Sequence, residues 1–67
     1  MDRESALRLI PTVYAVALRL YDAGMRDHEL AHTLGLEDEA VGPLLRLAED
    51  KLREAQQGAG SPRGPGE

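Results

Sequence analysis

The sequence predicts a small all-α protein, a bundle of three to four helices. Apolar residues recur at steps of three or four along most of the chain, and this period is typical of one face of an α-helix. Glycine and proline interrupt the pattern near positions 11, 24, 35 and 42, which divides it into short helical segments. A length of 67 residues limits the chain to one domain.

Two helices are expected in residues 2–23, at about 3–10 and 11–23. Proline lacks an amide hydrogen and costs roughly 3 kcal/mol inside a helix, whereas the first helical position tolerates it. We therefore expect a break near Ile10, with Pro11 opening the second helix. One apolar stripe on this region consists of Leu7, Ile10, Tyr14, Ala17, Leu18 and Tyr21.

A second apolar stripe runs beside the first and consists of Leu9, Val13, Val16 and Leu20. A helix that is apolar on two sides is usually covered on both. The second stripe therefore predicts a contact with a partner helix or a second copy of the chain. The alternative is ordinary burial under the N-terminal helix and the helix at about 38–56.

A short helix at about 28–34 and a longer helix at about 38–56 follow. Gly24 and Gly35 are expected to end the helices before them, because glycine readily adopts the left-handed conformation found there. The apolar face of the longer helix consists of Val41, Leu44, Leu45, Ala48, Leu52 and Ala55. Gly42 and Pro43 interrupt this helix and predict a bend or a delayed start. Residues 1–57 form the expected helical domain, and the Gly- and Pro-rich residues 58–67 an expected disordered tail.

Composition indicates a soluble cytoplasmic protein. The chain has no Cys, no run of about 20 apolar residues and no basic-then-apolar start typical of a signal peptide. The net charge is −4, whereas a compact nucleic-acid-binding protein usually carries a basic face. The placement of the eight Lys and Arg residues therefore decides whether DNA is a partner.

Residues 18–52 carry a resemblance to a known family. Glu29-Leu30-Ala31 and the turn Leu34-Gly35-Leu36 are followed by Val41, Leu45, Lys51 and Leu52. In this spacing, without a gap, they resemble the DNA-binding domain of LuxR-type regulators and region 4 of bacterial sigma factors. The resemblance implies a helix-turn-helix within the bundle, in which the helix at 38–56 is the recognition helix, and a role in bacterial transcription regulation.

DNA binding is the leading functional expectation from this resemblance. Recognition helices place their N-terminal residues in the major groove, where Arg, Lys, Asn and Gln read base edges. The basic residues expected at the DNA are Arg46, Lys51, Arg53, Arg19 and Arg26. Gly42 and Pro43 stand at reading positions but have no side chain that can read a base.

A protein-interaction adaptor with the same fold is the alternative. Glu37, Asp38 and Glu39 open the helix at about 38–56, where carboxylates suit the helix dipole but oppose the phosphates of DNA. In the adaptor these three acids contact a basic partner surface. The second apolar stripe, Leu9, Val13, Val16 and Leu20, completes the expected interface.

A zinc-binding pattern overlaps the same residues. The segment from His28 to His32 fits H-E-x-x-H, and with Gly35 and Asp38 it resembles metzincin-related proteases that use Asp as a third ligand. Those proteases need an upstream strand and a downstream Met turn, and neither is present here. A zinc-binding protein with the ligands His28, His32 and Asp38 is therefore the remote alternative.

The sequence thus predicts a cytoplasmic helix-turn-helix protein that is not an enzyme and needs no cofactor. The expected partner is DNA or a protein of the transcription machinery, with a homodimer through the second apolar stripe as a further expectation.

Overall fold

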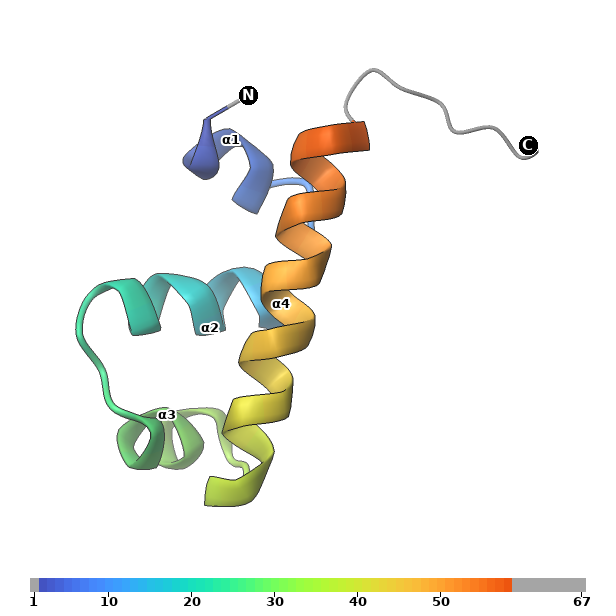
Figure 1. Cartoon of the computed structure of the whole chain (residues 1–67). Helices are drawn as coiled ribbons and strands as arrows, with labels where there is room; N and C mark the ends of the chain where they lie inside the picture. The colour runs from blue at the N-terminus through green and yellow to red at the C-terminus, as the bar shows by residue number, and fades with distance from the viewer. Residues whose placement is uncertain (1, 59–67) are drawn as a thin grey trace.

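Residues 2–58, which the computed structural model describes, form four α-helices and contain no strand. The helices are α1 (Arg3–Leu7), α2 (Thr12–Asp22), α3 (Asp27–Leu34) and α4 (Asp38–Gly58). α4 is the longest, and α1, α2 and α3 lie one after another along it (Figure 1). The predicted all-α class is confirmed. None of these helices combines the length and apolarity needed to cross a bilayer.

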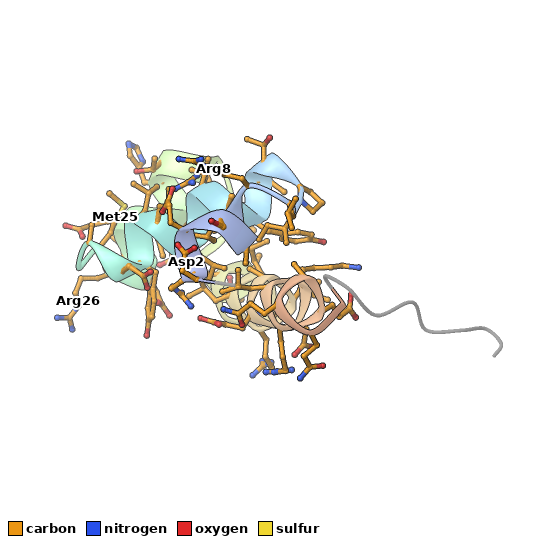
Figure 2. The ribbon with its side chains drawn as sticks, turned by 90° about the horizontal axis from the view of Figure 1, so that it is seen from above. Asp2, Arg8, Met25 and Arg26 are labelled. Carbon is orange, nitrogen blue, oxygen red and sulfur yellow. The ribbon has the colours of Figure 1, made fainter. Side chains whose placement is uncertain are left out.

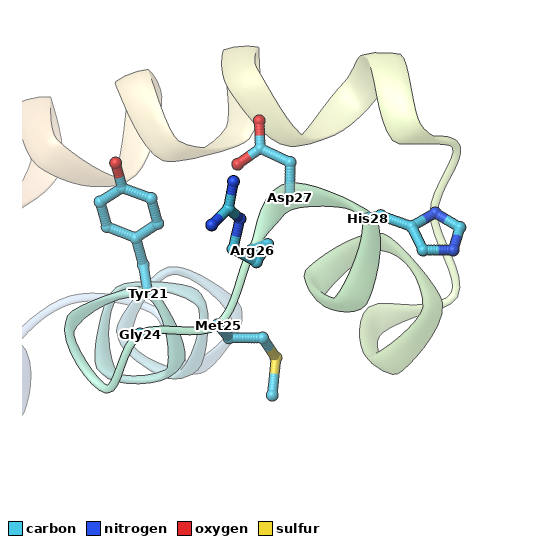
Figure 3. Close-up of a pocket in the computed structure, with 6 residues that line it drawn as sticks. All are labelled: Tyr21, Gly24, Met25, Arg26, Asp27 and His28. Atoms are coloured by element: carbon cyan, nitrogen blue, oxygen red, sulfur yellow. The ribbon is translucent and has the colours of Figure 1, made fainter.

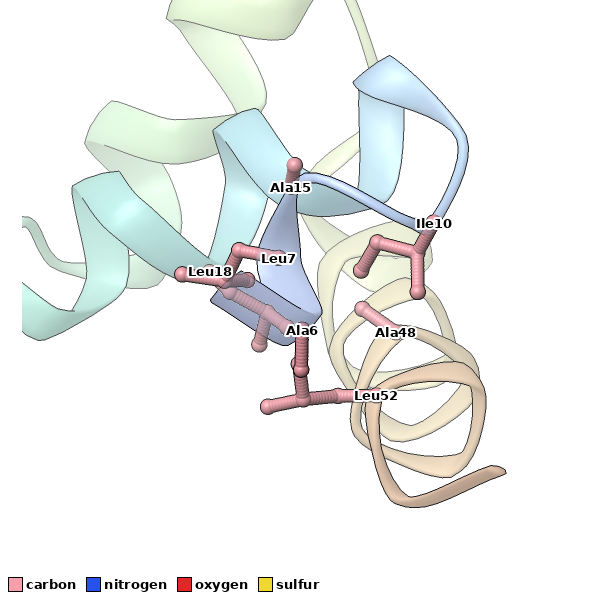
Figure 4. Packing of buried hydrophobic residues seen from close by; sticks show 7 residues of the cluster. All are labelled: Ala6, Leu7, Ile10, Ala15, Leu18, Ala48 and Leu52. Carbon is pink, nitrogen blue, oxygen red and sulfur yellow. The ribbon is translucent and has the colours of Figure 1, made fainter. Parts of the chain in front are cut away.

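The break between α1 and α2 falls earlier than predicted. α1 ends at Leu7 rather than at residue 10, and Pro11 caps α2 rather than forming its first residue. The proline ring disfavours the helical conformation for the residue before it, so Ile10 leaves the helix. Ile10 then turns inward and joins the cluster around Ala48 and Leu52 (Figure 4).

Polar contacts tie α1 to the rest of the bundle. The Asp2 carboxylate accepts hydrogen bonds from the hydroxyl of Ser5 at 2.7 Å and from its amide at 3.3 Å, and these bonds lower the pKa of Asp2. The Arg3 guanidinium lies 2.9 Å from Asp22 and 3.5 Å from Glu49. The hydrogen bond to Asp22 raises the pKa of Arg3. α1 is therefore held to both α2 and α4.

Gly24 and Gly35 form the two turns, as predicted. Their φ angles are +101° and +72°, in the left-handed region that glycine adopts readily. After Gly35, the amide of Leu36 donates to the carbonyl of Ala31 at 2.8 Å and closes the end of α3. α3 begins at Asp27, one residue before its expected start, with Arg26 as its cap.

α4 runs without interruption through Gly42 and Pro43, so the predicted delay in its start is wrong. Proline removes one hydrogen bond from the first turns of this helix. The buried residues Val41, Ala48 and Leu52 hold the helix against its neighbours on either side of that position. α4 ends at Gly58, and the remainder of the predicted tail, residues 59–67, lies outside the described residues.

Two apolar clusters hold the helices together. Leu18 is fully buried in the first cluster, where residues of α1, α2 and α4 meet. The second cluster consists of Leu30, Ala31 and Val41 and joins α3 to α4. Leu45 packs against both clusters, so the position of α3 depends on the packing of the whole bundle.

Candidate interaction surface

The starts of α3 and α4 carry a set of exposed carboxylates, which we call the acidic edge. It consists of Asp27, Glu29, Glu37, Asp38 and Glu39, all of which are exposed. The ring nitrogen Nδ1 of His28 lies 3.1 Å from Oδ2 of Asp38, so the two helix starts lie side by side. Carboxylates at helix N-termini are stabilised by the helix dipole, which explains why so many can gather there.

The turn between α2 and α3 adds one cation to this surface. The amide of Arg26 donates to the Glu29 carboxylate at 3.0 Å, which satisfies an amide at the start of α3. The side chain of Arg26 is exposed and projects away from the helices (Figure 2). The acidic edge therefore carries five carboxylates beside one guanidinium.

Two of the five predicted DNA-binding residues form ion pairs within the chain. Arg19 on α2 lies 2.6 Å from Glu4 on α1, and Arg53 lies 2.9 Å from Asp50 one turn earlier on α4. A paired guanidinium neutralises less phosphate charge than an unpaired one, because its charge is already balanced. Both residues are therefore weaker candidates for DNA contact than the sequence suggested.

The other three predicted DNA-binding residues, Arg46, Lys51 and Arg26, are exposed. None of them forms an ion pair with any other residue between positions 2 and 58. Arg46 is on the part of α4 that follows Gly42 and Pro43. It is the single cation in the first nine residues of α4.

Arg46 lines an open hollow of about 430 Å³ between α2, the start of α3 and α4. The rest of its lining consists of Tyr21, Asp27, Gly42, Leu45, Glu49, Asp50 and Arg53. Tyr21 and Asp27 also line a neighbouring hollow of about 750 Å³ at the α2–α3 turn, where both side chains point toward α4 (Figure 3). The charges of this surface are mixed, so it does not provide the continuous basic groove that follows a phosphate backbone.

The second apolar stripe is divided by the fold. Leu9 is 62% exposed and Val13 49%, whereas Val16 and Leu20 are half-buried. Leu20 packs against the cluster that joins α3 to α4. Only the first half of the stripe is therefore available to a partner.

Two further large apolar residues, Tyr21 and Leu47, are exposed. Tyr21 was assigned to the first apolar stripe but is 49% exposed, because it is at the end of α2 beside the open hollows. Leu47 is also 49% exposed. The exposure of Leu47 was predictable from the sequence, because Leu47 is outside the three-and-four spacing of the apolar face of α4.

The predicted zinc ligands do not form a three-ligand site. Among residues 2–58, no group of three or more His, Cys, Asp or Glu side chains is arranged to hold a metal ion. Asp38 contacts the ring of His28 instead of sharing a coordination position with His28 and His32. The side chains of His28 and Asp38 are 83% and 63% exposed, so their contact is a surface contact.

Comparison of the chain with protein-family models, with curated proteins and with solved structures finds no match.

Proposed function

We propose that this chain is a small helix-turn-helix protein of bacterial transcription regulation that binds RNA polymerase through its acidic edge rather than reading DNA. The observation that carries the proposal is the charge of that edge, where five exposed carboxylates occupy the starts of α3 and α4. In a helix-turn-helix protein the start of the recognition helix, here α4, enters the major groove, and the helix before it crosses the DNA backbone.

Several local features support the helix-turn-helix assignment. α3 and α4 follow one another through a three-residue connection that contains Gly35 with its positive φ. Ala31 is buried and small, which suits a close crossing of two helices. Leu30 and Val41 close the shared core between them. These are the positions on which the resemblance to LuxR-type regulators and sigma region 4 depends.

Electrostatics favours a basic protein partner over DNA. Binding to DNA gains free energy when Lys and Arg neutralise phosphates and release counterions. Here Glu37, Asp38 and Glu39 would oppose the phosphates, and Gly42 and Pro43 offer no base-reading group. A basic protein surface gains from the same carboxylates, mainly through faster association and correct orientation.

Direct DNA binding is the second candidate, and one observation favours it. Arg46, Lys51 and Arg26 are exposed and form no ion pair with another residue in the described part of the chain. Three phosphate contacts of this kind give weak binding that falls steeply with salt.

One variant separates the two functions because it changes them in opposite directions. Replacing Glu37 and Glu39 by Gln removes two exposed charges from the acidic edge and keeps the contact between Asp38 and His28. We expect this double variant to bind purified bacterial core RNA polymerase about tenfold more weakly, since exposed charge pairs contribute roughly 0.2–1 kcal/mol each. Glu54→Gln, an exposed carboxylate near the other end of α4, is the matched control and should leave binding unchanged.

The wild type and the double variant are then tested for binding to a fluorescent DNA duplex at about 50 mM salt, where phosphate contacts are strongest. If DNA is the partner, the double variant binds the duplex more tightly than the wild type, and polymerase binding is absent. Absence of binding to both the polymerase and the duplex would overturn the proposal and its alternative together.

A further inference from the structure

We propose that His28 and His32 form a two-histidine clip on α3 for a divalent late first-row transition-metal ion, with Zn²⁺ as the probe. The two residues are one helical turn apart, at positions i and i+4, and both are exposed. Their side chains line the same open hollow of about 480 Å³, together with Met25, Glu29 and Thr33. The metal site does not depend on the proposed function, because its ligands are two histidines, whereas the acidic edge consists of carboxylates.

The spacing of the two rings suits a shared metal ion. Residues four apart on a helix have Cβ atoms about 5–6 Å apart and lie on one face. Two imidazole nitrogens can therefore reach one ion from the same side, as in the first two ligands of helical zinc motifs. Water fills the remaining coordination positions, because the described residues offer no third protein ligand.

Asp38 orients the ring of His28. Its Oδ2 lies 3.1 Å from Nδ1 of His28. Because an ionised carboxylate can only accept a hydrogen bond, this contact favours the tautomer with the hydrogen on Nδ1. A hydrogen on Nδ1 leaves the lone pair on Nε2, the nitrogen that is free to bind a metal. Carboxylates in this position fix the ring and increase the basicity of the ligand nitrogen, and their loss typically costs 10- to 100-fold in metal affinity. Asp38 is therefore a positioning residue, not a ligand.

The donor set also defines the class of ion. Neutral imidazole suits Zn²⁺, Cu²⁺ and Ni²⁺, whereas Mg²⁺ and Ca²⁺ prefer a shell of oxygen ligands. We therefore expect Mg²⁺ at millimolar concentration to leave the histidines unchanged. The clip spans one turn of α3 and is preformed only when that turn is helical, so the ion binds the folded chain in preference to the unfolded one.

The test is a titration of the folded protein with ZnCl₂, followed by calorimetry and by the NMR signals of the histidine rings. We expect one ion per chain, with ring shifts at both His28 and His32. His32→Ala should lower the affinity at least tenfold and abolish the rise of the thermal midpoint with Zn²⁺. Asp38→Asn should weaken binding about tenfold, whereas Glu37→Gln, the neighbouring carboxylate without a contact to His28, should not.

Three results would overturn the proposal. The first is an unchanged Zn²⁺ affinity in His32→Ala, which would put the ion elsewhere. The second is the absence of ring shifts at stoichiometric Zn²⁺ in the wild type. The third is equal affinity in Asp38→Asn and the wild type, which would remove the orienting role of the carboxylate.

Discussion

Pro43 has no amide hydrogen to donate within α4, although the helix continues through it. Replacing it should therefore stabilise the protein. It is the sixth residue of α4 and is exposed, so its ring is not part of either apolar cluster. The first four amides of a helix have no intrahelical acceptor, but the sixth would normally donate to the carbonyl four residues earlier. In this chain that carbonyl belongs to Glu39 and lacks its usual donor.

We expect Pro43→Ala to raise the free energy of unfolding by about 2 kcal/mol. A proline inside a helix costs about 3 kcal/mol relative to alanine. Because only one turn of α4 precedes Pro43, we expect the gain to be smaller than this full value. For a domain of this size, 1 kcal/mol corresponds to about 4–8 °C in the thermal midpoint, so the expected rise is about 8–16 °C. Urea and thermal unfolding followed by helical circular dichroism measure both quantities.

Pro11→Ala is the matched control, with the opposite expected sign. Pro11 is the N-cap of α2, where its carbonyl accepts helical hydrogen bonds but no amide hydrogen is required, and its φ of −55° suits its ring. Replacing it gives the unfolded chain more conformational freedom, so the free energy of unfolding should fall by up to about 1 kcal/mol. A midpoint for Pro43→Ala at or below that of the wild type would refute the reasoning, since it would mean that α4 needs the shape that proline imposes.

Three further predictions concern the core, a turn and the pH dependence. Leu30→Ala should cost about 3 kcal/mol in urea unfolding, because Leu30 is fully buried, whereas Leu47→Ala, at a site 49% exposed, should cost less than about 1 kcal/mol. Equal costs would contradict the assignment of the second cluster. Gly35→Ala should cost about 1–2 kcal/mol by the same measurement, since the φ of +72° strains a residue with a side chain even though no atom crowds the site. An unchanged urea midpoint in Gly35→Ala would show that the turn between α3 and α4 can rearrange. The hydrogen bonds from Ser5 lower the pKa of Asp2, so their stabilisation is fully present above the ordinary aspartate pKa of about 3.9 and is lost as the pH falls through the lowered value. Ser5→Ala should therefore weaken the dependence of the thermal midpoint on pH in acid, and a pH profile identical to that of the wild type would argue against this contact.

Features that depend on neighbours within one helical turn were predictable from the sequence. Gly24 and Gly35 end their helices because only the local backbone conformation decides where glycine is favoured. The apolar spacing of α4 likewise identified Val41, Ala48 and Leu52 as its buried face. The ion pair between Arg53 and Asp50 was also within reach, since residues three apart on a helix are neighbours.

The candidate surface was less predictable because it combines residues from separate helices. The sequence placed Glu37, Asp38 and Glu39 at a helix start, but only the structure shows that Asp38 contacts His28 at the start of α3. The pairing of Arg19 with Glu4, fifteen residues away in the sequence, likewise makes Arg19 a weaker candidate for DNA contact than the sequence suggested.

The sequence by itself determined the all-α class, the two glycine turns and the buried face of α4, because helical periodicity and backbone preference act over a few residues. Only the tertiary structure decided which charges on different helices balance one another and which apolar residues stay exposed. Ile10 is buried and its neighbour Leu9 exposed because α4 covers one side of the turn after α1. Such choices depend on how the helices pack, and packing joins residues that are distant along the chain.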